Sequence, residues 1–409
     1  MVESSTKDAY DVVIVGAGMA GLACAYALRH SGARVALLER ARVGHDGASS
    51  GGRSRMYREM YSDPFLCRMA QRANVLWSEL ERAAGRPLRD PHGLLFYGES
   101  WDEETIEGSI PGARRVMDAQ GIPYEALTAD DIAARWPMHP RGGDVGLFEP
   151  SAGSIRADEV LAFLARSARR AGFDLREGVA VERLEPGTGG CDVVTAGGDV
   201  LRGRRVVVCA GPWTNTLLEP IGCGLDLELW SMMWGHYAVD PALAATMPQW
   251  FCFRQPGPDP DDGGLYYGFP VVDDDGPARI KVGIDWCPPS MRVRSMVDFA
   301  WQPHAPLPDL LDRFLREQLD GVGECLDLQC SPYTMSPDVN FVLDEVTDGV
   351  VVFTGGSGQA FKFAPLIGEL LATLARGDEP IGIDPWRATR PAMTARAELG
   401  VAGLNAAGE

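Results

Sequence analysis

The sequence predicts an α/β protein of two interleaved domains, one with a parallel sheet and one an α+β domain built on an antiparallel sheet. Three observations predict this fold. The chain opens with a strand, a glycine-rich turn and a helix; a second buried strand with such a turn lies near its end; and alternating strand patterns fill the region between. The 409 residues also exceed one simple core and suit two domains.

The first element is a Rossmann-type unit. Residues 11–15 read as an apolar strand, the run Gly16-Ala17-Gly18-Met19-Ala20-Gly21 opens a helix that ends near His30, and residues 35–38 form a strand that ends on Glu39. Glycines let backbone amides and a helix N-terminus approach a pyrophosphate, and an acid at this distance binds a ribose hydroxyl. These residues predict a dinucleotide site.

A second glycine-rich turn lies near the other end of the chain. Residues 350–354 form a buried-strand pattern that runs into Gly355-Gly356-Ser357-Gly358, and a helix follows from about Pro365. A cofactor held by both ends of a chain is long, which favours FAD over NAD.

A stretch of small residues, 47–52, precedes Arg53, Arg55 and Arg58, and its amides are expected to cover a second part of the cofactor. The pair Asp63-Pro64 then predicts a helix start, with aspartate as the cap and proline as the first residue.

The second domain is expected to begin with a strand at 94–97, a helix at about 103–120 and a helix capped at Thr128. A helix at 157–170, a strand near 178–183 and a hairpin that closes on 206–211 return to the first domain. The predicted segments are 1–91, 151–215 and 327–409 for the FAD-binding domain, and 92–150 and 216–326 for the substrate domain.

The main body of the second domain contains an antiparallel strand pair at 265–269 and 278–285. Alternation places Tyr267 on the face of Phe269, and Lys281 on the face of Asp285, with Lys281 opposite Tyr267. The acidic loops at 259–262 and 273–275 are read as solvated turns. Five aromatic residues are candidates for a pocket lining or for core packing: Trp230, Trp234, Phe253, Tyr267 and Tyr333.

Composition excludes several classes of protein. The net charge of -19 argues against nucleic acid or an anionic membrane as partner, and no apolar run approaches the roughly 20 residues of a membrane span. The polar first ten residues lack an export signal, so a cytoplasmic protein is expected. Nine cysteines without CxxC spacing fit a reducing compartment, and six histidines without ligand spacing predict no metal.

Lysine is rare in this chain. There are three lysines, Lys7, Lys281 and Lys362, against 35 arginines. Because arginine serves wherever only a positive charge is needed, an internal lysine is expected where a compact ammonium with a tunable pKa is required. On composition alone, chance placement is the alternative.

The chain resembles the monomeric sarcosine oxidase family of D-amino-acid-oxidase-like flavoproteins over nearly its whole length. Two stretches, 211–215 and 360–363, are most similar to the branch of this family found in nikkomycin biosynthesis, which oxidises cyclic imino acids. The resemblance rests on residues 16–39, 51–55, 208–213, 333–338 and 355–363.

The resemblance implies FAD and a mechanism. A hydride leaves the carbon next to a neutral secondary amine, an imine is released, and oxygen is reduced to hydrogen peroxide. Arg58 and Lys362 match the clamp for the substrate carboxylate, and Lys281 matches a lysine over the flavin that stabilises charge on oxygen. The remaining candidates near the substrate are Tyr267, Gln359 and Asp285. The candidate cofactor residues are Gly16, Gly18, Met19, Ala20, Gly21, Glu39, Arg40, Ser50, Arg53, Ser54, Arg55, Val181, Ala210, Gly211, Trp213, Cys330, Gly356, Gly358, Gln359 and Lys362.

The chain departs from the family pattern at three places. Gln359 and Asp285 stand where histidines are usual, which puts sarcosine itself in doubt as the substrate. The cysteine that binds the flavin usually lies at the place of Ser331, and Cys330 lies one residue further back. The sequence predicts covalent FAD through Cys330 if a bulge restores the register; otherwise the flavin is not covalently held, or Cys330 is a packing residue.

Three classes of function follow. The leading hypothesis is an oxidase of a secondary-amine or cyclic imino acid in specialised metabolism, with a small-molecule substrate and oxygen as partners and a monomeric chain. The second is a flavin-linked amino acid dehydrogenase that passes electrons to a carrier. The third is a non-catalytic flavin-binding redox protein.

Overall fold

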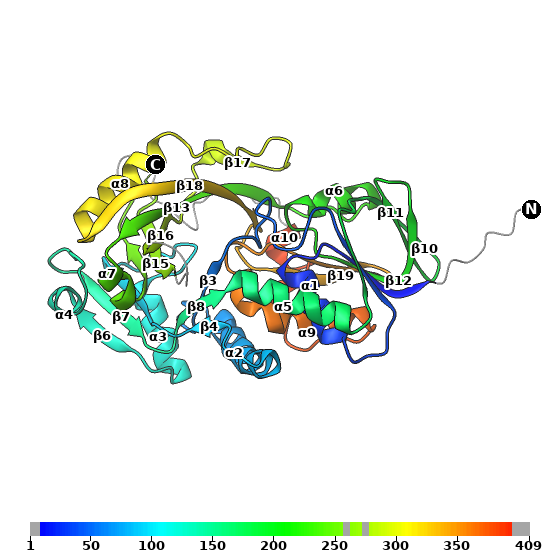
Figure 1. Ribbon diagram of the computed structural model, residues 1–409, viewed down its shortest axis with the longest axis horizontal. Helices are drawn as coiled ribbons and strands as arrows, with labels where there is room; N and C mark the ends of the chain where they lie inside the picture. Colours follow the sequence, from blue (N-terminus) through cyan, green and yellow to red (C-terminus); the bar gives the residue numbers. More distant parts are fainter. Residues whose placement is uncertain (1–8, 257–261, 272–277, 395–409) are drawn as a thin grey trace, which may run out of the picture.

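The computed structural model describes residues 9–256, 262–271 and 278–394, which form two lobes (Figure 1). Within these residues one lobe holds an eight-stranded sheet, the other holds a nine-stranded sheet, and a three-stranded sheet of β3, β8 and β4 lies between them. The predicted α/β class, with one Rossmann-type sheet and one largely antiparallel sheet, is confirmed. The bounds of the small sheet are β3 Ser54–Tyr57, β4 Arg89–Asp90 and β8 Gly153–Arg156.

The eight-stranded sheet has the order β10-β11-β12-β1-β2-β9, with β20 beside β12 and β19 beside β20. The strands β9, β2, β1, β12 and β20 are parallel, so their carboxyl ends meet at one edge. Ligands of open α/β sheets bind at such an edge. The bounds are β1 Tyr10–Val15, β2 Val35–Glu39, β9 Asp174–Glu177, β10 Val181–Gly187, β11 Gly190–Thr195, β12 Val200–Val208, β19 Val342–Thr347 and β20 Val350–Thr354.

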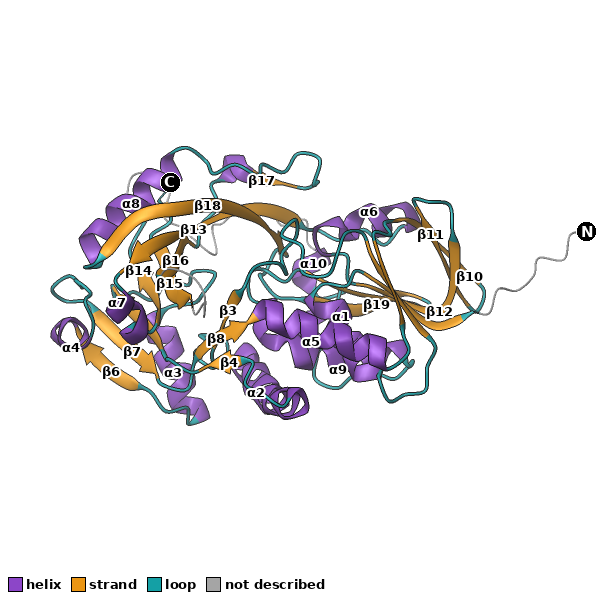
Figure 2. Ribbon diagram, in the orientation of Figure 1, coloured by secondary structure: helices purple, strands orange, loops and turns teal. Residues whose placement is uncertain are grey.

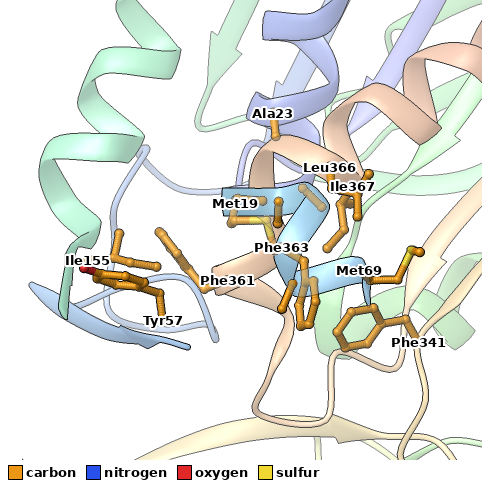
Figure 3. Packing of buried hydrophobic residues seen from close by; sticks show 14 of the residues in the cluster. Met19, Ala23, Tyr57, Met69, Ile155, Phe341, Phe361, Phe363, Leu366 and Ile367 are labelled. Atoms are coloured by element: carbon orange, nitrogen blue, oxygen red, sulfur yellow. The ribbon is translucent and has the colours of Figure 1, made fainter. Parts of the chain in front are cut away.

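The first and last long helices of this lobe pack against each other, with α5 alongside α1 (Figure 2). A Cβ atom added to Gly368 in α9 would lie 2.5 Å from the backbone oxygen of Ala23 in α1, so the two helices are in close contact. Figure 3 shows Met19, Leu366 and Ile367 in the core that they share. This packing brings both chain ends to one site. The bounds are α1 Met19–Leu28, α5 Ala157–Arg170 and α9 Ala364–Ala375.

The nine-stranded sheet has the order β17-β13-β16-β15-β14-β5-β7-β6, with β18 beside β13. Its neighbours are antiparallel except β14 and β5. The long strands β13 and β18 arch from this lobe toward the other (Figure 1). The bounds are β5 Leu94–Gly98, β6 Glu125–Thr128, β7 Val145–Glu149, β13 Glu228–Val239, β14 Gln249–Phe253, β15 Leu265–Val271, β16 Arg279–Ile284, β17 Arg292–Val293 and β18 Val322–Met335.

Within the described residues, seven further α-helices belong to the two lobes. No helix in the described part of the chain combines the length and the hydropathy needed to cross a bilayer. Asp63 accepts a hydrogen bond from the Phe65 amide and begins α2 as predicted, and Thr128 forms a capping box at α4. The bounds are α2 Pro64–Ala84, α3 Ile110–Gln120, α4 Ala129–Arg135, α6 Thr214–Leu218, α7 Pro241–Thr246, α8 Pro306–Gln318 and α10 Pro391–Thr394.

The helix predicted at 103–120 starts only at Ile110, so the prediction was wrong for residues 103–109. Gly108 has a φ of 87°, and Ser109 caps the helix by accepting a hydrogen bond from the Gly112 amide. The residues before Ser109 form a loop that carries Glu107. This loop reaches the site described below.

The predicted antiparallel pair is confirmed as β15 and β16, but Lys281 lies opposite Phe269 and not opposite Tyr267. Both aromatic residues share one face, so the predicted alternation holds. Residues 259–261 and 273–275 of the acidic loops lie outside the described residues. The domain boundaries stay a prediction; β18 spans residue 327 and belongs to the nine-stranded sheet.

Candidate active site

A long cavity in two connected parts lies at the carboxyl edge of the parallel strands. One part, called here the Glu39 part, is lined by the ends of β1 and β2; the other, the Lys362 part, extends to β15, β16 and β18. The two parts share Gly18, Ser49, Ser50, Cys209 and Gly211. An extended molecule such as a dinucleotide fits this shape.

The Glu39 part has the features of a nucleotide site. Gly16 has a φ of 97°, and a Cβ there would lie 2.3 Å from the Cys209 oxygen, so only glycine is accommodated. The Glu39 carboxylate accepts hydrogen bonds from the amides of Ala17, at 2.9 Å, and Ala41, at 3.0 Å. The acid is thereby fixed at the cavity wall, where a ribose hydroxyl binds in this fold.

Several other predicted cofactor residues line the same part. The Arg40 guanidinium lies 4.0 Å from the ring centroid of Trp213, so the two side chains form one wall. The Ser50 hydroxyl accepts a hydrogen bond from the Met19 amide at 3.1 Å and holds the small-residue stretch at the start of α1. Val181, Ala210 and Gly211 complete this lining.

Three predicted cofactor residues lie outside the cavity lining: Gly21, Arg53 and Cys330, the last of which is described below. A Cβ on Gly21 would lie 1.9 Å from the Gly16 oxygen, so this glycine allows the turn to pack on its own helix. The Arg53 oxygen accepts a hydrogen bond from the Ala157 amide and joins β3 to α5. Gly21 and Arg53 therefore shape the turn and the junction of β3 with α5, and they do not line the cavity.

The Lys362 part gathers charged and aromatic side chains from segments that are far apart in the sequence. Its charged residues are Arg55, Glu107, Lys281, Asp285 and Lys362, and its aromatic residues are Trp234, Phe251, Tyr267, Phe269, Tyr333, Phe353 and Phe361. Of the five aromatic candidates from the sequence, Trp230 and Phe253 pack in the core instead. The remaining predicted residues in this lining are Met19, Ala20, Ser54, Gly356, Gly358 and Gln359.

Arg58 does not line the cavity. It is 2% exposed and donates a hydrogen bond from Nη2 to Oε2 of Glu107, which itself lines the cavity. Nε and Nη1 of Arg58 have no hydrogen-bond partner among the described residues. The two cations predicted to form one clamp are therefore placed differently: Lys362 faces the cavity, and Arg58 lies behind Glu107.

Burial shifts the pKa values of Asp285 and Lys362 in the Lys362 part of the cavity. Burial, together with the Arg58 charge, lowers the pKa of Lys362 to about 7, against the opposite effect of Glu107 and Asp285. Burial and the neighbouring Glu107 carboxylate raise the pKa of Asp285 well above its usual range. Burial therefore favours the protonated form of Asp285, and Lys362 titrates near neutrality.

Gln359 presents a hydrogen-bond acceptor to the cavity. Its Nε2 donates to the backbone oxygen of Ile106 at 2.9 Å, and its Oε1 is buried without a partner among the described residues. Since the Ile106 oxygen can only accept, the orientation of the amide is determined. A ligand with an N–H or O–H group would satisfy Oε1.

The structure places Ser331, and not Cys330, at the cavity. Along β18 the side chains of Ser331 and Tyr333 face the cavity, whereas Cys330 is paired with Met233 and packs in the core on the opposite face of the sheet. No bulge of β18 lies between Cys330 and Tyr333 to restore the register. Burial also raises the pKa of the Cys330 thiol and makes it a poor nucleophile. The predicted link to the flavin through Cys330 has no support from this geometry.

Sequence reasoning missed Glu107. The residue was assigned to a helix, and its partner Arg58 is far away in the sequence. The Gly108-Ser109-Ile110-Pro111 sequence was the available signal, because a serine cap followed by an early proline marks a helix start and places Glu107 in the preceding loop.

Known proteins are similar to this chain over most of its length. The profile of the family described as FAD dependent oxidoreductase matches residues 11–374. The chain is 32% identical to the monomeric sarcosine oxidase of Streptomyces avermitilis, over 92% of this chain and 97% of that protein. It is 29% identical to the N-methyl-L-tryptophan oxidase of Yersinia pestis, with the same two coverages, and 29% identical to the human peroxisomal sarcosine oxidase over 97% and 100%.

Solved structures show the same fold. NikD, an unusual amino acid oxidase essential for nikkomycin biosynthesis, superimposes with a TM-score of 0.85 at 30% identity, over 93% of this chain and 97% of that chain. The L-proline dehydrogenase of P. horikoshii superimposes with a TM-score of 0.74 at 18% identity, over 93% and 96%, a likeness that supports the fold alone.

Proposed function

Because the chain belongs to the FAD dependent oxidoreductase family, we propose that it is an oxidase of amino acids whose nitrogen is a secondary amine, including cyclic imino and N-methyl amino acids. The observation that carries the proposal is the Lys362 part of the cavity, where a cation for a carboxylate and acceptors for an N–H group face one space. Sarcosine, N-methyl-L-tryptophan and NikD oxidases among the similar proteins support the same substrate class.

FAD is the cofactor of this family, and the cavity residues fit it. A Cβ at Gly16 would meet the Cys209 backbone, so the tight turn needs glycine. Gly18 lines both parts of the cavity, and hydrogen bonds fix Glu39 at the wall where a ribose binds in this fold. Buried Thr334 and Thr354 line the Lys362 part with hydroxyls that lack partners among the described residues, as expected of a site built for a polar ring. When bound, FAD accepts a hydride and returns electrons to oxygen. A covalent link is not part of this proposal, because Ser331 occupies the cavity side of β18.

Lys362 is proposed to bind the substrate carboxylate directly, with a charge-assisted hydrogen bond. Arg58 can bind the substrate carboxylate with two hydrogen bonds only after Glu107 has moved away from the Arg58 guanidinium. Gln359 Oε1 accepts from the amine N–H, and Asp285, whose pKa is raised by burial, lines the same space. Tyr267 forms part of the aromatic wall against which the substrate packs.

Lys281 is proposed to serve the oxygen half of the reaction. The substrate loses a hydride from carbon and a proton from nitrogen, and oxygen takes up two electrons and two protons to give hydrogen peroxide. A fixed ammonium stabilises the negative charge that oxygen acquires with its first electron. This role separates an oxidase from a dehydrogenase that uses a carrier.

A screen of cyclic and N-methyl amino acids for peroxide release tests the proposed function. Each amino acid is paired with its decarboxylated amine, and flavin bleaching without air is followed by exposure to air. The proposal expects bleaching by the amino acid, about ten- to a hundredfold weaker use of the amine, and peroxide on aeration. Equal use of both compounds refutes the carboxylate site, and bleaching without reoxidation by air indicates a dehydrogenase.

The cytoplasmic location and the monomeric state remain proposals that rest on the sequence. Fractionation of the producing cells and light scattering of the purified protein test them.

A further inference from the structure

The ammonium of Lys281 has an aromatic partner in place of a carboxylate. Its Nζ lies 4.0 Å from the ring centroid of Trp234 and 5.6 Å from that of Phe269. Among the described residues no salt bridge to Lys281 is present. An ammonium above a tryptophan face is attracted by the ring quadrupole, most strongly where water is excluded.

Trp234 is held in place on two sides. Its indole N–H donates a hydrogen bond to the Ser331 hydroxyl at 3.0 Å, from the neighbouring strand β18. The His236 ring packs edge-on against it, with 5.3 Å between centroids. Trp234, Ser331 and Lys281 all line the Lys362 part of the cavity, so the indole is a fixed platform at its wall.

The other charged groups near Lys281 do not provide a counter-ion. Burial lowers the pKa of Lys281 well below its usual value, and the positive charge of Arg55, from β3, lowers it further. Asp327, from β18, favours the charge, but this carboxylate already contacts His236 Nδ1 at 3.0 Å. His236 lies directly opposite Lys281 in the β13–β16 pairing and, once protonated, adds a further positive charge. Asp285 directly follows β16, four residues after Lys281, and burial raises the pKa of its carboxyl, which disfavours the anion there.

We propose that Trp234, held by Ser331, is a positioning residue for oxygen reduction: its ring keeps the Lys281 ammonium charged and directs it into the cavity. The inference rests on the oxygen role proposed for Lys281. It explains why a serine faces the cavity at residue 331, since the hydroxyl accepts the indole N–H. A tryptophan that only filled space would leave the protonation of Lys281 unchanged when another apolar side chain replaced it.

The rarity of lysine allows a direct test. Holoenzyme labelled with ¹³C at lysine Cε should give resonances from only three lysines, and Lys281→Met assigns the one of interest. The ¹³C chemical shift of the Lys281 Cε atom is followed against pH in the wild type, Trp234→Leu, Trp234→Phe and Ser331→Ala. Trp301→Leu, in a loop where the ring is 43% exposed, is the matched control.

The pKa of Lys281 should fall by about one unit or more in Trp234→Leu, less in Ser331→Ala, and least in Trp234→Phe, which keeps a ring. Reoxidation by air, measured by stopped flow, should slow about tenfold or more in Trp234→Leu when the pH lies above the shifted pKa, and should recover toward lower pH. Flavin reduction by substrate should change much less, and Trp301→Leu should match the wild type in every measurement.

Each outcome bears on one idea. An unchanged Lys281 titration in Trp234→Leu, in protein that still binds FAD, overturns the inference while leaving the proposed function intact. Unchanged reoxidation in Lys281→Met overturns the oxygen role itself. If Trp234→Leu does not bind FAD, Trp234→Phe and Ser331→Ala decide, because they keep an aromatic ring at residue 234.

Discussion

At the scale of single residues, Lys362 makes substrate binding depend on pH. Its pKa is about 7 in the free site, and only the ammonium form binds a carboxylate by charge. The dissociation constant of a simple carboxylate inhibitor should therefore be constant below pH 7 and rise by about tenfold per pH unit above it. Isothermal calorimetry across this range checks the slope.

Lys362→Met should weaken binding at pH 6 by about one to two orders of magnitude and remove the slope. Arg316→Met, on the exposed face of α8, is the control and should bind as the wild type does. A dissociation constant independent of pH in the wild type would contradict the assignment of Lys362.

Cys330 and Ser331 make a second prediction at this scale. Because the Cys330 thiol packs on the face of β18 that turns away from the cavity, acid precipitation should leave the yellow colour in the supernatant. Cys330→Ala should behave identically. A yellow pellet from the wild type that becomes colourless in Cys330→Ala would restore the covalent link, and mass spectrometry of the pellet would locate it.

At the scale of elements, the contact between α1 and α9 joins the two ends of the cofactor site. Gly368→Ala puts a methyl group 2.5 Å from the Ala23 oxygen, so the helices must separate. The free energy of unfolding should fall by about 1 to 3 kcal/mol, as for an overpacked core. Urea denaturation measures this change, and FAD affinity should fall with it, because the start of α1 lines the cavity.

Gly142→Ala is the matched control for this substitution. A Cβ at Gly142 meets nothing within 4 Å, so the free energy of unfolding should stay within about 0.5 kcal/mol of the wild type. Equal stability of both variants would show that the helices move apart without cost.

At the scale of the whole molecule, the cavity is lined by both large sheets, so FAD should stabilise both lobes. With free FAD at about 100 times its dissociation constant, FAD binding should raise the free energy of unfolding by about 2.7 kcal/mol. Removing FAD should speed hydrogen exchange at 16–21, 47–55 and 355–360 and also at the cavity ends of β13 and β18. Helix α4 and strand β6, absent from the cavity lining, are the internal control. Faster exchange in one lobe alone would contradict a shared site.

The local patterns of the sequence indicated the turns that line the Glu39 part of the cavity. The Gly16 turn, Glu39 and the strand pair around Lys281 depend on contacts within one element or between neighbouring ones. Strand period and turn chemistry determine such contacts. The two internal lysines were singled out by the rarity of lysine and by the family resemblance, and both line the cavity.

Three features were decided only by the tertiary structure. Whether Arg55 or Arg58 faces the cavity depends on how β3 lies against a loop that arrives from the other lobe and carries Glu107. The side of β18 that meets the cavity depends on its pairing with β13, and a shift of one residue exchanges Cys330 for Ser331. The aromatic partner of Lys281 is Trp234, which lies on β13, whereas Lys281 lies on β16. The sequence by itself therefore determined the fold class and the candidate cofactor turns, whereas pairings between distant segments decided which charges meet, because strand register and loop path are set by contacts that no local pattern encodes.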